Sequence, residues 1–178
     1  MAKTDYLLQV EVERVLSLLT PANRTAVRVE LHTGLRIGDV LALRKSDIDK
    51  GQQFWITEQK TGKRRRVSVP LELWREMRAV CGEEWVFPSR CDQKRHRTRQ
   101  AVWKDMKRAE RALRLKVNVG THSARKVYAV QLLEKWGDIE RVRRALNHGS
   151  LNVTMLYALA DQMTARRVAG ARKRCKRS

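Results

Sequence analysis

The chain has 178 residues, a length that suits one domain. Apolar residues make up 42% of it, enough to build a core, and this excludes a disordered basic tail. Lysine and arginine number 39 against 19 aspartate and glutamate, which gives a net charge of +20. A compact domain with that charge repels itself unless an anionic partner binds, and nucleic acid is the commonest such partner. A membrane surface is less favoured, because the basic residues are spread through the chain instead of gathering on one amphipathic helix.

The cysteines and the apolar segments bear on where the protein works. Cys81, Cys91 and Cys175 are odd in number, and no pair of them has the spacing of zinc ligands. We interpret them as reduced thiols of a cytosolic protein. The N-terminal residues lack the long apolar run of a signal peptide, and no stretch approaches the roughly 18 apolar residues of a membrane span. The sequence therefore predicts a cytoplasmic protein with no metal centre and no membrane segment.

The first half of the chain predicts helices interrupted by one hairpin. Apolar residues recur with helical spacing, and Pro21 and Gly34 are stop signals that end the first two helices. Strand-forming residues at 54–57 and 67–69 flank a turn that contains Gly62, a pattern typical of a β-hairpin. The helices are expected, in chain order, at 12–19, 22–32, 37–41 and 71–80.

The second half predicts a basic loop followed by helices alone. Residues 81–97 show no clear period, whereas Gly137 can end one helix and Asp138 can cap the next. A basic tail is expected from about 165–178. The helices are expected at about 98–115, 123–136, 139–146 and 151–159. Because no repeat or linker is evident, we predict one domain over 1–178, mainly α with a small antiparallel β-sheet (α+β).

Four segments of the chain carry distinctive motifs. They are TGLRIGDVLALRKSDID at 33–49, EQKTGKRRRVSVP at 58–70, THSAR at 121–125 and LNHGSLNVTMLYAL at 146–159. In this order they resemble the catalytic boxes of tyrosine recombinases such as the lambda-type phage integrases. The resemblance spans nearly the whole chain. It implies the tyrosine-recombinase catalytic-domain fold and a site-specific recombinase or integrase that cuts and rejoins DNA through a covalent 3′-phosphotyrosyl intermediate, with no metal, ATP or other cofactor.

The resemblance makes Tyr157 the nucleophile, and Arg36 and Arg125 the two arginines that clamp the phosphate. The chemistry fits these residue types. A phenolate leaves phosphorus more readily than an alkoxide, so a tyrosyl link stays reversible. Negative charge grows on the non-bridging oxygens in the transition state, and arginine stays charged and binds oxygen pairs bidentately.

The resemblance also assigns residues to proton transfer. Lys60 matches the general acid for the departing 5′ oxygen, although Lys63 lies three positions on in the same turn. His122 matches the histidine that assists proton transfer at the tyrosine, and His148 matches the residue that hydrogen-bonds the phosphate. Asp39 is expected to lie behind the site and to orient or balance one of the clamping arginines.

The basic residues around these motifs are expected to contact the DNA backbone. The candidates are Lys63, Arg64, Arg65, Arg66, Lys94 and Arg95. The partner is double-stranded DNA, and the resemblance implies a monomer in solution that forms a tetramer on paired DNA sites. Family members usually carry an N-terminal core-binding domain, which we expect to be absent here because the first catalytic-domain helix begins within about ten residues of Met1.

Other functions fit parts of the pattern. A non-catalytic basic DNA-binding regulator derived from the same family would have the same charge, but it gains nothing from a complete catalytic set. Type IB topoisomerases share the chemistry, although the integrase-like boxes favour recombination. An RNA-binding protein would be expected to show stacking aromatic surfaces or an RNA motif, and the sequence shows neither. The DNA target, the direction of the reaction and the accessory proteins are not encoded in any of these patterns.

Overall fold

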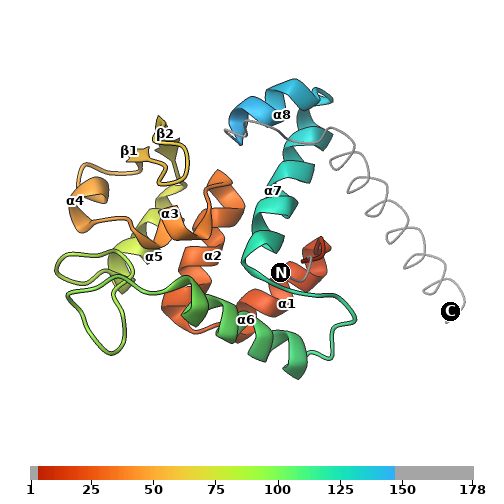
Figure 1. Cartoon of the computed structure of the whole chain (residues 1–178), viewed down its shortest axis with the longest axis horizontal. Coiled ribbons are helices and arrows are strands. Elements are labelled where there is room, and N and C mark those ends of the chain that lie inside the picture. Colours follow the sequence, from red (N-terminus) through yellow and green to blue (C-terminus); the bar gives the residue numbers. More distant parts are fainter. Residues whose placement is uncertain (1–3, 147–178) are drawn as a thin grey trace, which may run out of the picture.

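The computed structural model describes residues 4–146 and shows a mainly helical domain with one two-stranded antiparallel sheet (Figure 1). The elements are α1 (Gln9–Leu18), α2 (Pro21–Thr33), α3 (Ile37–Leu41), α4 (Lys45–Ile48), β1 (Gln53–Thr57), β2 (Arg64–Ser68), α5 (Leu71–Val80), α6 (Arg99–Ala112), α7 (Thr121–Trp136) and α8 (Ile139–Ala145). The predicted helix at 151–159 and the basic tail lie outside the described residues. None of the helices in 4–146 has the length and apolar character needed to span a membrane.

Helix α2 occupies the centre of the fold. It packs against α7 on one side and α5 on the other, and Figure 1 shows it between them. Its Ala26 and Val29 are fully buried in the main apolar core, because apolar side chains three positions apart share one face of a helix. A smaller apolar cluster joins α8 to α7 through Ile139, Val142 and Leu146. Helix α7 therefore packs against both α2 and α8.

The second strand of the hairpin begins earlier than the apolar residues at 67–69 predict. Phe54 pairs with Val67, and both are buried on the inner face. The pairing extends through Arg65, which lies opposite Ile56, so that β2 begins at Arg64 rather than at Val67. Polar residues can continue a ladder because the backbone makes its hydrogen bonds.

Two further features differ from the sequence-based expectation. The four-residue α4 was not predicted, since it is too short to show a helical period, and it is held by a hydrogen bond from the Arg44 amide to Asp47 Oδ2 (2.8 Å). The segment expected as a basic loop at 81–97 contributes fully buried Val86 and Phe87 to the core. It is therefore an anchored connection, irregular in backbone but fixed at its middle.

The carboxyl group of Glu30 lies inside the protein, on the face of α2 that meets α7. Glu30 is 0% exposed. Loss of solvent raises the pKa of Glu30 well above its usual range, and the charge of Arg125 and the backbone amide of Ile37 offset only part of that effect. The folded protein therefore binds a proton at this position more tightly than the unfolded chain does.

This burial predicts a pH-dependent gain in stability for Glu30→Gln. The unfolded carboxyl loses its proton near pH 4.3, about its free value, whereas the folded one keeps it to higher pH. The parent therefore loses stability as pH rises through that interval, and the glutamine variant does not. In denaturant unfolding from pH 4 to 8, the free energy of unfolding of Glu30→Gln should exceed that of the parent by an amount that grows with pH. The exposed Glu83→Gln is the control, and a pH-independent difference for Glu30→Gln contradicts the assignment.

A second prediction concerns the glycine that ends α2. Gly34 and Gly137 both follow a helix in the left-handed region, with φ of +64° and +65°. A Cβ at Gly34 would lie 2.3 Å from the ring of Tyr128, whereas a Cβ at Gly137 meets nothing within 4 Å. Gly137→Ala should therefore cost about 1 kcal/mol of backbone strain, and Gly34→Ala about 3 kcal/mol once the displaced ring is included. Thermal unfolding of both variants measures this, and equal costs would show that the ring yields freely.

Candidate active site

Arg36 lies at the start of α3 and is held by a buried carboxylate. Its Nη1 donates to Glu58 Oε2 at 2.6 Å, and the Glu58 side chain is fully buried. The same oxygen accepts a hydrogen bond from the Thr61 hydroxyl (3.3 Å), and Glu58 Oε1 lies 3.6 Å from Arg65 Nη1. The Arg36 side chain is 17% exposed, so it is mostly buried. Glu58 thus fixes the direction of the Arg36 side chain.

Lys60 lies in the hairpin turn directly after Glu58. The turn is closed by backbone bonds from Gly62 N to Glu58 O (2.8 Å) and from Glu58 N to Lys63 O (3.0 Å). The Lys60 side chain is exposed on this turn, and Gly62 supplies the positive φ of 65°. The geometry gives Lys60 a fixed backbone and a long mobile side chain.

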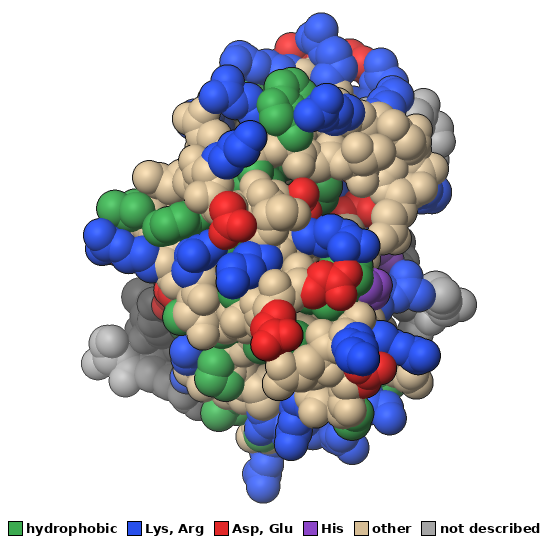
Figure 2. All heavy atoms as spheres, turned by 90° about the vertical axis from the view of Figure 1, so that its left-hand side faces the viewer, with side chains coloured by type: hydrophobic (Ala, Val, Ile, Leu, Met, Phe, Trp, Pro, Cys, Tyr) green, Lys and Arg blue, Asp and Glu red, His purple; other side chains and the backbone are tan. Residues whose placement is uncertain are grey.

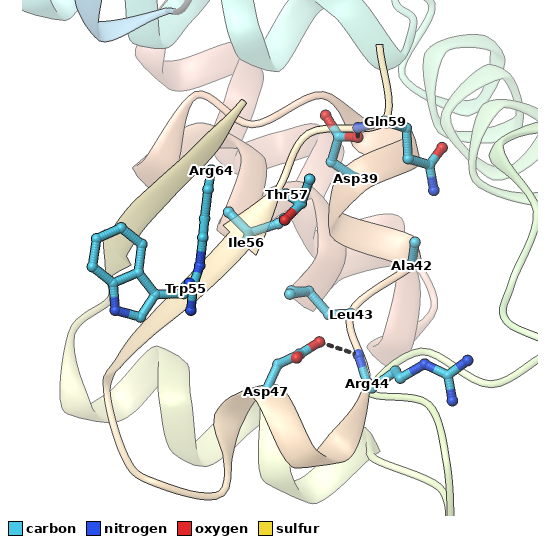
Figure 3. A pocket seen from close by; sticks show the side chains of 10 residues that line it. All are labelled: Asp39, Ala42, Leu43, Arg44, Asp47, Trp55, Ile56, Thr57, Gln59 and Arg64. Carbon is cyan, nitrogen blue, oxygen red and sulfur yellow. Dashed lines mark hydrogen bonds between the residues drawn. The ribbon is translucent and has the colours of Figure 1, made fainter. Parts of the chain in front are cut away.

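Asp39 holds the same turn from α3. Its Oδ1 accepts a hydrogen bond from the backbone amide of Gln59 at 3.0 Å, and Figure 3 shows the two residues side by side. Asp39 was expected to orient an arginine. In the structure its hydrogen bond goes to the residue before Lys60, so it bears on the placement of the lysine turn.

Arg125 lies on α7 and is buried, with 6% of its surface exposed. Its Nη1 donates to Gly34 O and its Nη2 to Leu146 O, each at 2.6 Å. Loss of solvent lowers the pKa of Arg125 most, and the charges of Arg36 and Arg65 lower it further. The charges of Glu58 and Glu30 oppose this, and the resulting pKa is about 10. The guanidinium therefore stays charged at neutral pH.

His122 lies at the surface one turn before Arg125, at the start of α7. Partial burial of the imidazole lowers its pKa, and positive charges lower it further; these belong to Arg99, Arg125, Lys126 and Arg36. At neutral pH the ring is therefore neutral and can accept a proton.

The fold brings Arg36, at the start of α3, together with two predicted site residues of α7, His122 and Arg125. Arg36, His122 and Arg125 influence one another electrostatically, and the turn of Lys60 is joined to this group through Glu58. His148 and Tyr157 lie outside the described residues. Within 4–146, no group of three or more His, Cys, Asp or Glu side chains has the arrangement of a metal site.

The predicted DNA-contacting residues fall into two groups. Five of the six are exposed, namely Lys63, Arg64, Arg66, Lys94 and Arg95. Arg64 lies over the exposed Trp55 ring, 4.9 Å from its centre, as Figure 3 shows. Lysine and arginine side chains are spread over the side of the molecule drawn in Figure 2, with acidic side chains interspersed mainly across its middle.

Arg65 differs from this group, because its side chain turns towards the protein. Its Nη2 donates to Thr33 O (2.5 Å) and its Nη1 to Ala145 O (2.8 Å). The sequence treated it as one of four equivalent basic residues. The alternation of β2 could have separated it, since Arg65 shares the inner face with buried Val67. By the same period of two, Glu58, two positions after the buried Ile56, shares its inward face, and the sequence did not single this residue out.

An open hollow of about 520 Å³ lies beside the hairpin, shown in Figure 3. It is lined by Asp39, Ala42, Leu43, Arg44, Asp47, Trp55, Ile56, Thr57, Gln59 and Arg64. Of the predicted site residues only Asp39 and Arg64 border it, so the hollow is distinct from the group around Arg36 and Arg125.

Comparison with known proteins gives consistent matches. Residues 5–163 match the family described as the Phage integrase family. The probable integrase/recombinase YoeC of Bacillus subtilis is 31% identical over 145 residues, which cover 76% of each chain. Tyrosine recombinase XerA of Thermococcus kodakarensis is 29% identical over 161 residues, 85% of this chain and 56% of XerA. The chain thus spans about half to three quarters of the length of these relatives.

Solved structures show the same architecture. A crystal structure of XerA recombinase superposes with a TM-score of 0.72 at 19% identity, covering 97% of this chain and 65% of that one. A lambda integrase dimer bound to a core site also gives 0.72 at 19% identity, covering 90% and 49%. At this identity the likeness establishes the fold. Together with the match over residues 5–163, it shows that the chain belongs to the phage integrase family and has the fold of a tyrosine recombinase catalytic domain.

Proposed function

We propose that this chain is the catalytic part of a site-specific DNA recombinase, which cuts and rejoins strands through a 3′-phosphotyrosyl bond at Tyr157. The observation that carries the proposal is that the fold brings Arg36, from the start of α3, to the His122 and Arg125 pair of α7, about 90 positions further along the chain. Membership of the phage integrase family supports the same chemistry. A protein that only bound DNA would gain nothing from such a convergence.

The two arginines bind the phosphate that is attacked. Each guanidinium is already oriented, Arg36 by Glu58 and Arg125 by the carbonyls of Gly34 and Leu146. Charge that develops on the non-bridging oxygens is therefore met by donors that need little reorganisation. This task is the one that a metal ion performs in many nucleases, and we propose that the reaction needs neither metal nor ATP.

The bonds and protons balance within the same set of residues. The Tyr157 oxygen forms a bond to phosphorus, and the bond from phosphorus to the 5′ oxygen breaks. The phenolic proton passes towards His122, whose lowered pKa keeps it ready to accept. Lys60 gives a proton to the leaving 5′ oxygen, and His148 hydrogen-bonds the phosphate. Rejoining reverses these steps, because the phosphotyrosyl bond retains the energy of the broken one.

The partner proposed for this chemistry is double-stranded DNA in the cytoplasm. Exposed basic residues of the hairpin and of the 81–98 connection supply sequence-independent phosphate contacts. Among the structural neighbours is a lambda integrase tetramer bound to a Holliday junction. By analogy we propose that the protein is a monomer in solution and a tetramer on two paired DNA sites.

Tyr157→Phe tests the nucleophile. The change removes one hydroxyl and keeps the ring, so covalent attachment should be abolished while DNA affinity stays nearly unchanged. A nicked suicide substrate, from which the cut end diffuses away, traps the adduct on a denaturing gel in the presence of EDTA. An adduct formed by the phenylalanine variant places the nucleophile elsewhere. No adduct from the parent protein favours a DNA-binding regulator instead.

A second experiment assigns the general acid. Loss of a general acid lowers the rate by about 100-fold or more, so Lys60→Ala should cleave slowly. A substrate with sulfur in place of the bridging 5′ oxygen should restore the rate, because a thiolate leaves without a proton. Lys63→Ala is the matched control from the same turn. Rescue of Lys63→Ala, and not of Lys60→Ala, would exchange their roles.

A further inference from the structure

Two arginines from different elements bridge the same pair of chain segments. Arg125 on α7 bonds the carbonyls of Gly34 and Leu146. Arg65 on β2 bonds the carbonyls that precede them, Thr33 O at 2.5 Å and Ala145 O at 2.8 Å. Consecutive carbonyls on each side are therefore held by two neighbouring guanidinium groups.

These bonds satisfy groups that helices leave without partners. The last carbonyls of an α-helix have no intrahelical donor, and positive charge is favourable there. Thr33 is the last residue of α2 and Ala145 the last of α8, so Arg65 joins the C-terminal ends of both helices. A planar guanidinium reaches two carbonyls at once, which an ammonium group does with less geometric control.

The position of the α8 end matters for the proposed chemistry. The chain leaves α8 at Ala145, and His148 follows only two positions after Leu146. Arg125 has a second task at the phosphate in the proposed mechanism. Arg65 supplies a bridge to the same segment that does not depend on the orientation of Arg125.

The surroundings of Arg65 direct it away from solvent. Its side chain is 20% exposed, and Nη1 also lies 3.6 Å from the buried Glu58 carboxylate. Its neighbours in the strand, Arg64 and Arg66, are exposed on the opposite face. The charge of Arg65 is therefore balanced within the protein, whereas its neighbours are available to an external anion.

We propose that Arg65 is a positioning residue of the recombination reaction, which holds the end of α8 beside Arg125. The sequence runs on from this end to His148 and Tyr157. The proposal rests on the function proposed above. It removes Arg65 from the set of DNA-contacting cations and leaves Arg64 and Arg66 in it.

The test compares three neighbouring arginines of one strand. Arg64→Met, Arg65→Met and Arg66→Met each remove one charge, and cleavage is followed on the suicide substrate over a range of protein concentrations. For Arg64 and Arg66, the log–log salt dependence of DNA binding should flatten by about 0.9, and the cleavage defect should disappear as protein is added. For Arg65, the salt slope should stay unchanged and the rate at saturation should fall about tenfold or more, since the loss is in positioning.

Arg65→Lys separates position from charge. It retains the cation but does not reproduce the planar fork, so it should recover only part of the saturated rate. If Arg65→Met fails to fold, Arg65→Lys still tests whether position or charge matters at this residue. Full recovery by lysine, or a salt slope for Arg65→Met that falls like those of its neighbours, would overturn the proposal.

Amide hydrogen exchange gives a second readout that does not depend on catalysis. The Leu146 amide donates to Val142 O at 3.0 Å in the last turn of α8. Its exchange should accelerate in Arg65→Met and Arg65→Lys and not in Arg64→Met. If the parent protein forms no adduct, the proposed function fails while this readout still tests the bridge. Unchanged exchange in the Arg65 variants shows that Arg65 does not hold α8.

Discussion

Mutual repulsion among three buried or half-buried guanidinium groups is the constraint on which the candidate site depends. Arg36 and Arg65 both lower the pKa of Arg125, which shows how close their charges lie. The repulsion is offset in two ways. Glu58 supplies a full negative charge to Arg36 and Arg65, and backbone carbonyls at helix ends supply partial ones. Glu30 also opposes the lowering of the Arg125 pKa, although burial raises the pKa of Glu30 itself.

This arrangement ties the site to the completion of the fold. Glu58 comes from the hairpin and Arg36 from the α2–α3 connection, 22 positions away. Arg125 reaches a carbonyl 91 positions distant, and Arg65 one that is 80 positions distant. Each partner satisfies a charge or a carbonyl that would otherwise be costly to bury. The hairpin, the end of α2 and the end of α8 are consequently stabilised by the same residues that define the site.

The sequence predicted the longer elements well and the inward-facing charges poorly. α2, α5 and α7 carry apolar residues at regular spacing and clear end signals, so their bounds are near those expected. By family resemblance, the site motifs predicted roles for Arg36 and Arg125, and the fold brings these two arginines near each other. Arg65 and Glu58 were not separated from their neighbours, because a run of charges was interpreted by composition. The alternation of side chains along the strands would have separated them, since Arg65 lies two positions before the buried Val67 and Glu58 two positions after the buried Ile56.

Orientation by these partners leaves the arginines able to bind a phosphate. A guanidinium carries five N–H donors. Among the described residues, the bonds of Arg125 to Gly34 and Leu146 use two of them, and the bond of Arg36 to Glu58 uses one. The remaining N–H donors belong to side chains whose rotamers are already fixed by these bonds. An incoming anion therefore does not have to order these side chains when it binds. Donors held in this way are most effective where charge develops during a reaction. The structural hydrogen bonds of these arginines are therefore compatible with their proposed catalytic use. By orienting the guanidinium groups in advance, these bonds prepare them to bind a phosphate.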